Sequence, residues 1–192
     1  MTRTYTMTRR AERQAETRQR IVEAAIALHG TVGPAQTTIS MVAERAGVQR
    51  HTLYAHFPDD RSLLVACSGS FMERDPLPDA DAWRAIADQQ ERLRKGLLAI
   101  YDWYSRNARL VACVLRDAEH HAPTKEVVDL HMGPSMTAYH EVLGSALSAQ
   151  QRPILYMALS FFTWRTLTQD AGLKQKAAVK AMVQAIASAA SG

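Results

Sequence analysis

The sequence predicts an all-α protein in which a small N-terminal helical domain precedes a larger helical domain. Apolar residues recur at spacings of three and four along most of the chain, and the alternation typical of strands is absent. Pro76 and Pro78 interrupt the helical pattern and give the clearest boundary signal. The chain has 192 residues, of which 47% are hydrophobic, so it is long enough for a small domain followed by a larger one.

Four helices are expected in the N-terminal part, each bounded by a capping residue or a helix breaker. They cover residues 10 or 16 to 28, 39–46, 50–56, and a stretch that begins at 60. Gly30 can end the first helix, because glycine tolerates a left-handed conformation after a helix. Thr37 and Thr38 can cap the second helix and Gly47 can close it, while Asp59 can cap the fourth.

Five or six further helices are expected in the C-terminal part. The longest carries an apolar stripe that comprises Trp83, Ile86, Leu93, Leu97, Ile100 and Tyr104. The others are expected over residues 108–118, from 124 to a break near 133, 135–149, 153–169 and 174–190. Pro134 removes a backbone donor and breaks or kinks one of them, whereas Pro153 suits the first turn of another.

Residues 39–58 carry the most informative pattern, two short helices joined by a tight turn at Gly47. Ala43 is small where the two helices cross, and an apolar seam between them can form from Val42, Val48 and Leu53. A rigid unit of this kind can place its second helix in the DNA major groove, which is wide enough to admit a helix. On that second helix, Arg50 offers a forked donor for guanine or phosphate.

This stretch resembles the helix-turn-helix domain of the TetR family of transcriptional regulators. The matching residues are Thr37-Thr38-Ile39, Val42-Ala43, Ala46-Gly47-Val48, Thr52-Leu53-Tyr54, His56-Phe57 and Leu63-Leu64. The resemblance implies an all-α homodimer with an N-terminal three-helix DNA-binding domain and a larger C-terminal domain for effector binding and dimerisation. We therefore expect a basic arm over residues 1–16, the DNA-binding domain over 17–66 and the C-terminal domain over 67–192.

The resemblance also implies which residues touch DNA. Phosphate contacts are expected from Thr38, Tyr54 and His56, and groove contacts from Gln49, Arg50, His51 and Thr52. The family often has lysine at the start of the fourth helix, where this chain has Asp60 followed by Arg61. An acidic residue suits the positive end of a helix but repels phosphate, so we expect Arg61 or the basic arm to replace that contact.

The first 20 residues, which are the basic arm and the four residues after it, account for the net charge of the chain. They contain Arg3, Arg9, Arg10, Arg13, Arg18 and Arg20 against Glu12 and Glu16, so this segment carries 6 − 2 = +4, which equals the formal charge of the whole chain. Such an arm can lie on phosphates or enter a groove. The alternative is a solvated tail.

Aromatic, sulfur-containing and polar residues of the C-terminal part are candidates for an effector pocket, because pockets between helices are lined by such side chains. The effector candidates are Trp103, Met136, His140, Phe161, Trp164 and Arg165. The alternative for the aromatic residues is an ordinary core.

A stripe of apolar residues on the last helices predicts the dimer contact. Its members are Phe162, Val179, Met182, Val183 and Ile186, and the alternative is that they pack on the chain's own core.

Several other classes of protein are disfavoured. Two cysteines 46 residues apart argue against a disulfide framework or a zinc site, and the histidine spacing against another metal site. No cofactor is expected, because phosphate-binding glycine motifs are absent.

We expect a cytoplasmic homodimer without a membrane span, which binds a pseudo-palindromic DNA operator and leaves it when a small, largely apolar or aromatic ligand binds. The alternatives are a ligand-independent architectural DNA-binding protein, and an enzyme that uses the two-helix unit only for packing.

Overall fold

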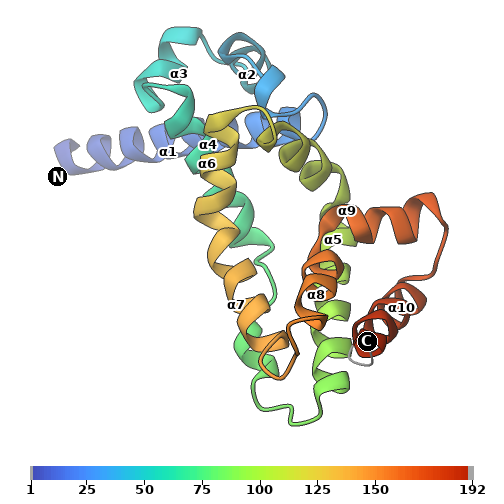
Figure 1. Cartoon of the computed structure of the whole chain (residues 1–192). Helices are drawn as coiled ribbons and strands as arrows, with labels where there is room; N and C mark the ends of the chain where they lie inside the picture. The colour runs from blue at the N-terminus through green and yellow to red at the C-terminus, as the bar shows by residue number, and fades with distance from the viewer. Residues whose placement is uncertain (1, 190–192) are drawn as a thin grey trace. The chain divides into compact units, whose positions relative to one another are not determined.

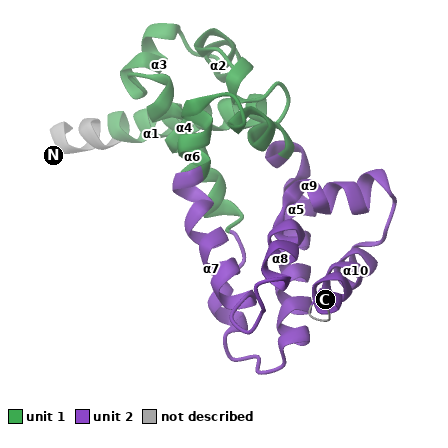
Figure 2. Cartoon of the chain, in the orientation of Figure 1, with its two compact units in different colours: residues 1–76, 112–128 green, residues 77–111, 129–192 purple. Residues whose placement is uncertain are grey.

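A computed structural model describes residues 2–189 of the chain, with side chains from residue 9 onward. Within these residues every regular element is a helix and no strand occurs (Figure 1), so the predicted all-α class is confirmed. The chain forms two compact units (Figure 2). The headpiece unit comprises residues 1–76 and 112–128, and the C-terminal unit comprises residues 77–111 and 129–192.

The headpiece helices follow their local capping signals closely. They are α1 Thr2–His29, the 3₁₀ turn η1 Pro34–Gln36, α2 Ile39–Ala46, α3 Arg50–His56 and α4 Asp60–Arg74. Thr38 Oγ1 accepts the Met41 N–H at 3.3 Å, and Gly47 ends α2 in the left-handed region with φ 65°. The Asp59 carboxylate accepts the Ser62 N–H at 2.6 Å and so caps α4. The predicted bounds of α2 and α3 are therefore confirmed.

Two expectations about the first helix are wrong. The helix α1 begins at Thr2 rather than at residue 10 or 16, because no glycine or proline interrupts the chain before Gly30. Gly30 does not adopt a left-handed conformation at the end of α1. The positive φ that follows the helix lies at Gly33 instead, with a value of 95°.

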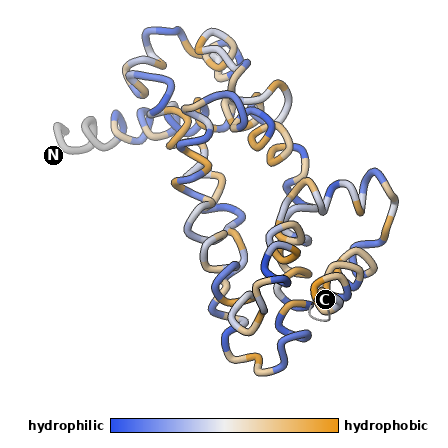
Figure 3. The backbone as a smooth tube through the Cα atoms, viewed as in Figure 1, coloured by the Kyte–Doolittle hydropathy of each residue, from blue (hydrophilic) through white to orange (hydrophobic). Residues whose placement is uncertain are grey.

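The core of the headpiece unit joins the helices α1, α2, α3 and α4. Ile21 and Ala25 of α1 are buried against apolar side chains of α2, α3 and α4, which include Val42, Leu53 and Leu63. Each fully buried valine, leucine or isoleucine side chain stabilises the fold by roughly 1.5–3 kcal/mol relative to leaving that side chain exposed. Apolar and polar residues intermix along the part of α1 that is coloured in Figure 3.

The second segment of the headpiece unit is a helical hairpin tip, which we define as residues 112–128. It contains the end of α5 (Gln89–Ala118) and most of α6 (Ala122–His131). Each of these helices therefore has one part in the headpiece unit and the other in the C-terminal unit. The expected separate helix over residues 108–118 is wrong, because α5 continues through it without interruption.

The remaining elements belong to the C-terminal unit. They are η2 Ala80–Trp83, α7 Gly133–Leu143, α8 Gln151–Leu159, α9 Phe161–Arg165, the π-helical turn η3 Thr166–Asp170 and α10 Gln175–Ser188. Pro134 lies in the first turn of α7, so the predicted break between α6 and α7 is confirmed. The expected helix over residues 135–149 is shorter, because α7 ends at Leu143. None of the helices in the described part of the chain combines the length and hydropathy that a membrane span requires.

The helix expected over residues 153–169 is interrupted at Ser160, whose backbone is extended with φ −70° and ψ 133°. Two buried tyrosines of α5 explain how the break is tolerated. The Tyr101 hydroxyl donates to the Ala158 carbonyl at 2.9 Å, and the Tyr104 hydroxyl donates to the Leu159 carbonyl at 2.7 Å. These bonds satisfy carbonyls at the end of α8 that would otherwise lack partners in the interior.

Candidate nucleic-acid interface

The recognition helix α3 exposes its polar side chains because a single residue, Leu53, is buried within it. Leu53 packs in the headpiece core, and the opposite face of the helix is exposed to solvent. On that face, Gln49, Arg50 and His51 are exposed, and 45% of Tyr54 is accessible to solvent. These residues are available for contact with a groove or with phosphates, as the sequence leads us to expect.

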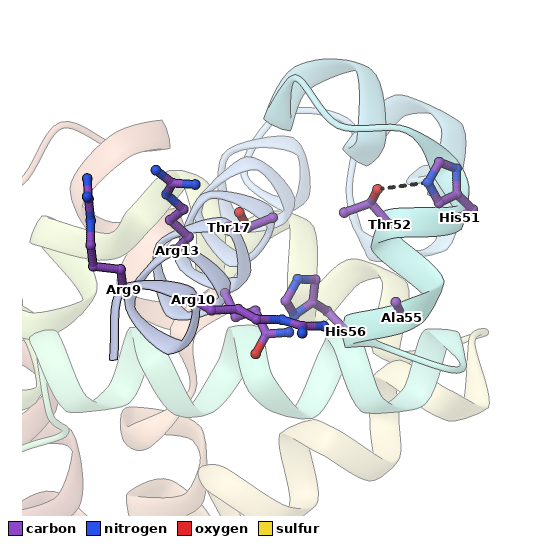
Figure 4. A pocket seen from close by; sticks show the side chains of 9 residues that line it. Arg9, Arg10, Arg13, Thr17, His51, Thr52, Ala55 and His56 are labelled. Carbon is purple, nitrogen blue, oxygen red and sulfur yellow. Dashed lines mark hydrogen bonds between the residues drawn. The ribbon is translucent and has the colours of Figure 1, made fainter. Parts of the chain in front are cut away.

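A basic groove of about 670 Å³ lies between α1 and α3. Its lining includes Arg9, Arg10 and Arg13 of α1 together with His51, Thr52 and His56 of α3, and Figure 4 shows these side chains around the same space. The hydroxyl of Thr52 lies 3.3 Å from His51 Nε2, within hydrogen-bond distance. The residues that line the groove include no carboxylate, so the local potential favours a phosphate.

The arm is therefore helical over its described part, and three of its arginines share a groove with the recognition helix. The unbroken run of helix-forming residues before Gly30 is the signal in the sequence that could have identified this geometry. The side chain of Arg3 lies outside the described residues.

Two other predicted DNA-binding residues lie away from this groove. Thr38 and Arg61 line a smaller pocket of about 150 Å³, whose lining also includes Ile39, Val42 and Leu64. Arg61 donates from Nε and Nη2 to Glu126 Oε1 of the hairpin tip, at 2.9 and 2.5 Å. The hydrogen bond and charge of Arg61 hold the pKa of Glu126 below its ordinary value.

A buried carboxylate fixes the loop that leads into α2. Asp117, at the end of α5, is almost fully buried and accepts the Ala35 N–H at 2.9 Å and Arg116 Nε at 2.8 Å. Arg116 also donates to the Val32 carbonyl at 3.0 Å. The hairpin tip therefore holds the backbone between α1 and α2. No sequence signal indicated this role, because an acidic residue near the end of a helix is usually on the solvated face.

His29 is buried near Asp117, and burial lowers its pKa to about 4, although the charge of Asp117 acts in the opposite direction. The unfolded chain, with a histidine pKa near 6.5, binds this proton more tightly than the folded protein does. Acid therefore favours unfolding, and the stability present above about pH 6.5 is lost as the pH falls towards 4. The full loss is about 3 kcal/mol.

We expect the wild-type protein to lose about 2 kcal/mol more than His29→Gln does when the pH falls from about 7 to about 5. Urea denaturation at both pH values, followed by circular dichroism, measures the difference. The same pH dependence in both proteins would show that His29 is not the titrating group.

The candidate effector residues separate into two groups. Trp103, Phe161 and Trp164 are buried and meet at Tyr104, with ring centroids 5.9, 5.4 and 6.0 Å from the Tyr104 ring. Among the described residues, Trp164 Nε1 is buried without a hydrogen-bond partner. His140 of α7 stacks on Tyr156 instead, at a centroid distance of 5.1 Å.

The two remaining effector candidates are half-buried. Met136 belongs to α7, and the guanidinium of Arg165 in α9 lies 5.5 Å from the centre of the Phe162 ring.

Most of the candidate dimer residues on α10 are buried within the chain itself. Val179, Met182 and Ile186 pack in the C-terminal unit, where α10 contacts α8. Val183 and Phe162 are half-buried. The apolar side chains exposed on α8 are Tyr156 and Met157, neither of which is among the predicted dimer residues. Helical periodicity identifies an apolar face, but it does not indicate whether the partner is the same chain or a second copy.

Comparison with known proteins agrees with this architecture. Residues 21–67 match the family model described as bacterial regulatory proteins, tetR family. The chain is 36% identical over 105 residues to the transcriptional regulator TtgR of Pseudomonas putida, which covers 54% of this chain and 50% of that protein. It is 30% identical over 151 residues to the class C tetracycline repressor of Escherichia coli, which covers 76% of this chain and 62% of the repressor.

A solved structure extends the likeness to the whole fold. FadR of Bacillus subtilis, determined in complex with stearoyl-CoA, has a TM-score of 0.61 at 16% identity, over 88% of this chain and 96% of that one. The matching helix-turn-helix residues, the two-unit helical fold and these relatives lead to one assignment. The chain belongs to the TetR family of bacterial transcriptional regulators.

Proposed function

We propose that this protein is a homodimeric repressor that binds a pseudo-palindromic operator and leaves it when a small, largely apolar or aromatic ligand binds the C-terminal unit. The observation that carries the DNA-binding part is the basic groove, which is lined by arginines of α1 together with side chains of the recognition helix α3. Arg50 on α3 reads a base, while the arginines of α1 and the side chains of Thr38, Tyr54 and His56 hold phosphates.

Dimerisation supplies the symmetry that a pseudo-palindrome requires, because two recognition helices must lie about 34–36 Å apart, or one DNA turn. The exposed apolar side chains of α8 support a contact between two copies. The exposed fraction is 70% for Tyr156 and 43% for Met157, and both lie within α8, the helix that packs on α10. We place the dimer contact on this face of α8 and on the half-buried Phe162 and Val183.

The ligand proposal is supported by the buried aromatic cluster that comprises Trp103, Tyr104, Phe161 and Trp164. These rings favour an apolar or aromatic ligand, and the Trp164 N–H offers a donor for a carbonyl or ether oxygen. The related FadR was crystallised with stearoyl-CoA, which also carries a long apolar chain. Ligand binding would then favour a dimer arrangement whose recognition helices no longer match the operator.

We expect Arg50→Ala to weaken binding to the operator by roughly 1–3 kcal/mol and to reduce the preference for the operator over a mismatched duplex. Arg109→Ala serves as the matched control, since Arg109 is an exposed arginine of the C-terminal unit. Fluorescence anisotropy on both duplexes measures the two effects.

An equal loss on both duplexes would assign Arg50 to a phosphate rather than to a base. Footprinting on operator DNA tests the wider proposal. Protection that does not depend on sequence would favour the architectural alternative over a repressor.

A further inference from the structure

The start of α4 is held by a side chain of the hairpin tip. Arg61, the second residue of α4, gives two of its guanidinium N–H groups to one oxygen of Glu126, at 2.9 and 2.5 Å. Both side chains remain more than half exposed, so the pair is open to solvent and to any approaching anion. Arg61 also shares a pocket with Thr38, which caps α2 and is a candidate phosphate contact.

The charges around this pair are unfavourable for a phosphate. Asp59 and Asp60 begin α4, and Glu126 adds a third carboxylate beside Arg61. Arg61 is therefore a cation at the start of α4 that could attract DNA, and Glu126 occupies the donors that a phosphate would use. A carboxylate and a phosphate oxygen accept from arginine in the same forked geometry.

We propose that Glu126 competes with a DNA phosphate for Arg61, so that the ion pair weakens operator binding in the free protein. This inference rests on the proposed DNA-binding function and names an internal contact that regulates it. An exposed ion pair of this kind contributes little to stability, so a phosphate can displace Glu126 readily. The released Arg61 then supplies the contact that Asp60 denies at the start of α4.

The competition connects DNA binding with the hairpin tip. Glu126 belongs to α6, a helix that continues from the headpiece unit into the C-terminal unit. Any change that strengthens the Arg61–Glu126 pair lowers DNA affinity, and DNA binding must weaken the pair by the same factor, because coupling between two binding events is reciprocal.

The test compares wild-type protein with Glu126→Gln, Arg61→Ala and the double variant, by anisotropy titration of one operator duplex over a range of salt concentrations. We expect Glu126→Gln to bind about two- to fivefold more tightly than wild type. Its log–log salt slope should match that of wild type, because Arg61 contacts a phosphate in both complexes, whereas Arg61→Ala should flatten the slope by roughly 0.9, as expected for the loss of one phosphate contact. In the Arg61→Ala background, the substitution at Glu126 should retain little of this gain.

Glu119→Gln is the matched control, since it removes the same charge from an exposed residue of the same hairpin tip. An equal gain from Glu119→Gln would reduce the effect to general electrostatics and overturn the proposal. Unchanged or weaker binding by Glu126→Gln would also overturn it, and weaker binding would show instead that the pair positions α4. If wild-type protein binds no duplex at all, the DNA-binding function itself fails, a result distinct from each of these outcomes.

Discussion

Ile186→Asp is expected to destabilise the C-terminal unit by several kcal/mol and to abolish both dimerisation and operator binding. Ile186 is fully buried on α10, and Gln151 Nε2 donates to its backbone carbonyl at 3.0 Å. The substitution removes an apolar side chain worth roughly 1.5–3 kcal/mol and introduces an unpaired charge into the interior. Thermal denaturation and sedimentation velocity measure the two effects.

Met157→Asp separates folding from assembly. Met157 lies on α8 and 43% of it is exposed in the single chain, so the new charge remains solvated in the monomer. We expect this variant to keep a normal melting temperature and to sediment as a monomer with weak operator binding. A folded, dimeric Ile186→Asp variant would contradict the observed packing of α10, and a dimeric Met157→Asp variant would place the contact elsewhere.

The headpiece could be predicted closely because its signals are local. Thr38 and Asp59 cap the helices that follow them, and Gly47 adopts the left-handed conformation that only glycine takes without strain. Leu53 and Phe57 are buried as their spacing indicates. Each of these features depends on residues within a few positions along the chain, so the sequence contains the information needed.

The contacts between the hairpin tip and the rest of the headpiece unit could not be predicted in this way, because they join residues that are far apart in the sequence. Arg61 and Glu126 are 65 residues apart, and Ala35 and Asp117 are 82 residues apart. Nothing in the spacing of one sequence indicates such pairs. The interruption at Ser160 was missed for a related reason, since it depends on hydroxyl groups supplied by Tyr101 and Tyr104 of another helix. Similarly, periodicity could not decide whether the stripe on α10 faces its own chain or a second copy.

Gly33→Ala is expected to destabilise the headpiece by about 2–4 kcal/mol and to weaken operator binding. The backbone of Gly33 has φ 95° and ψ 157°, a region that is essentially restricted to glycine and costs other residues about 1–3 kcal/mol. A methyl group at this position would also overlap the Asp117 carboxylate and the guanidinium of Arg116. The loop to α2 would have to move, and with it the Ala35–Asp117 hydrogen bond.

Alanine substitutions at two other glycines separate the backbone strain at Gly33 from the overlap with Asp117 and Arg116. Gly47 also has a positive φ, 65°, but a methyl group there would meet no atom within 4 Å, so Gly47→Ala reports backbone strain of about 1 kcal/mol. Gly133 has neither constraint, and alanine there should be neutral or stabilising by up to about 1 kcal/mol. Urea denaturation of the three variants gives the order of stability. If Gly33→Ala is no less stable than Gly47→Ala, the Asp117 contact does not constrain the loop. If it is clearly less stable, the difference measures how firmly the hairpin tip holds the entry to α2.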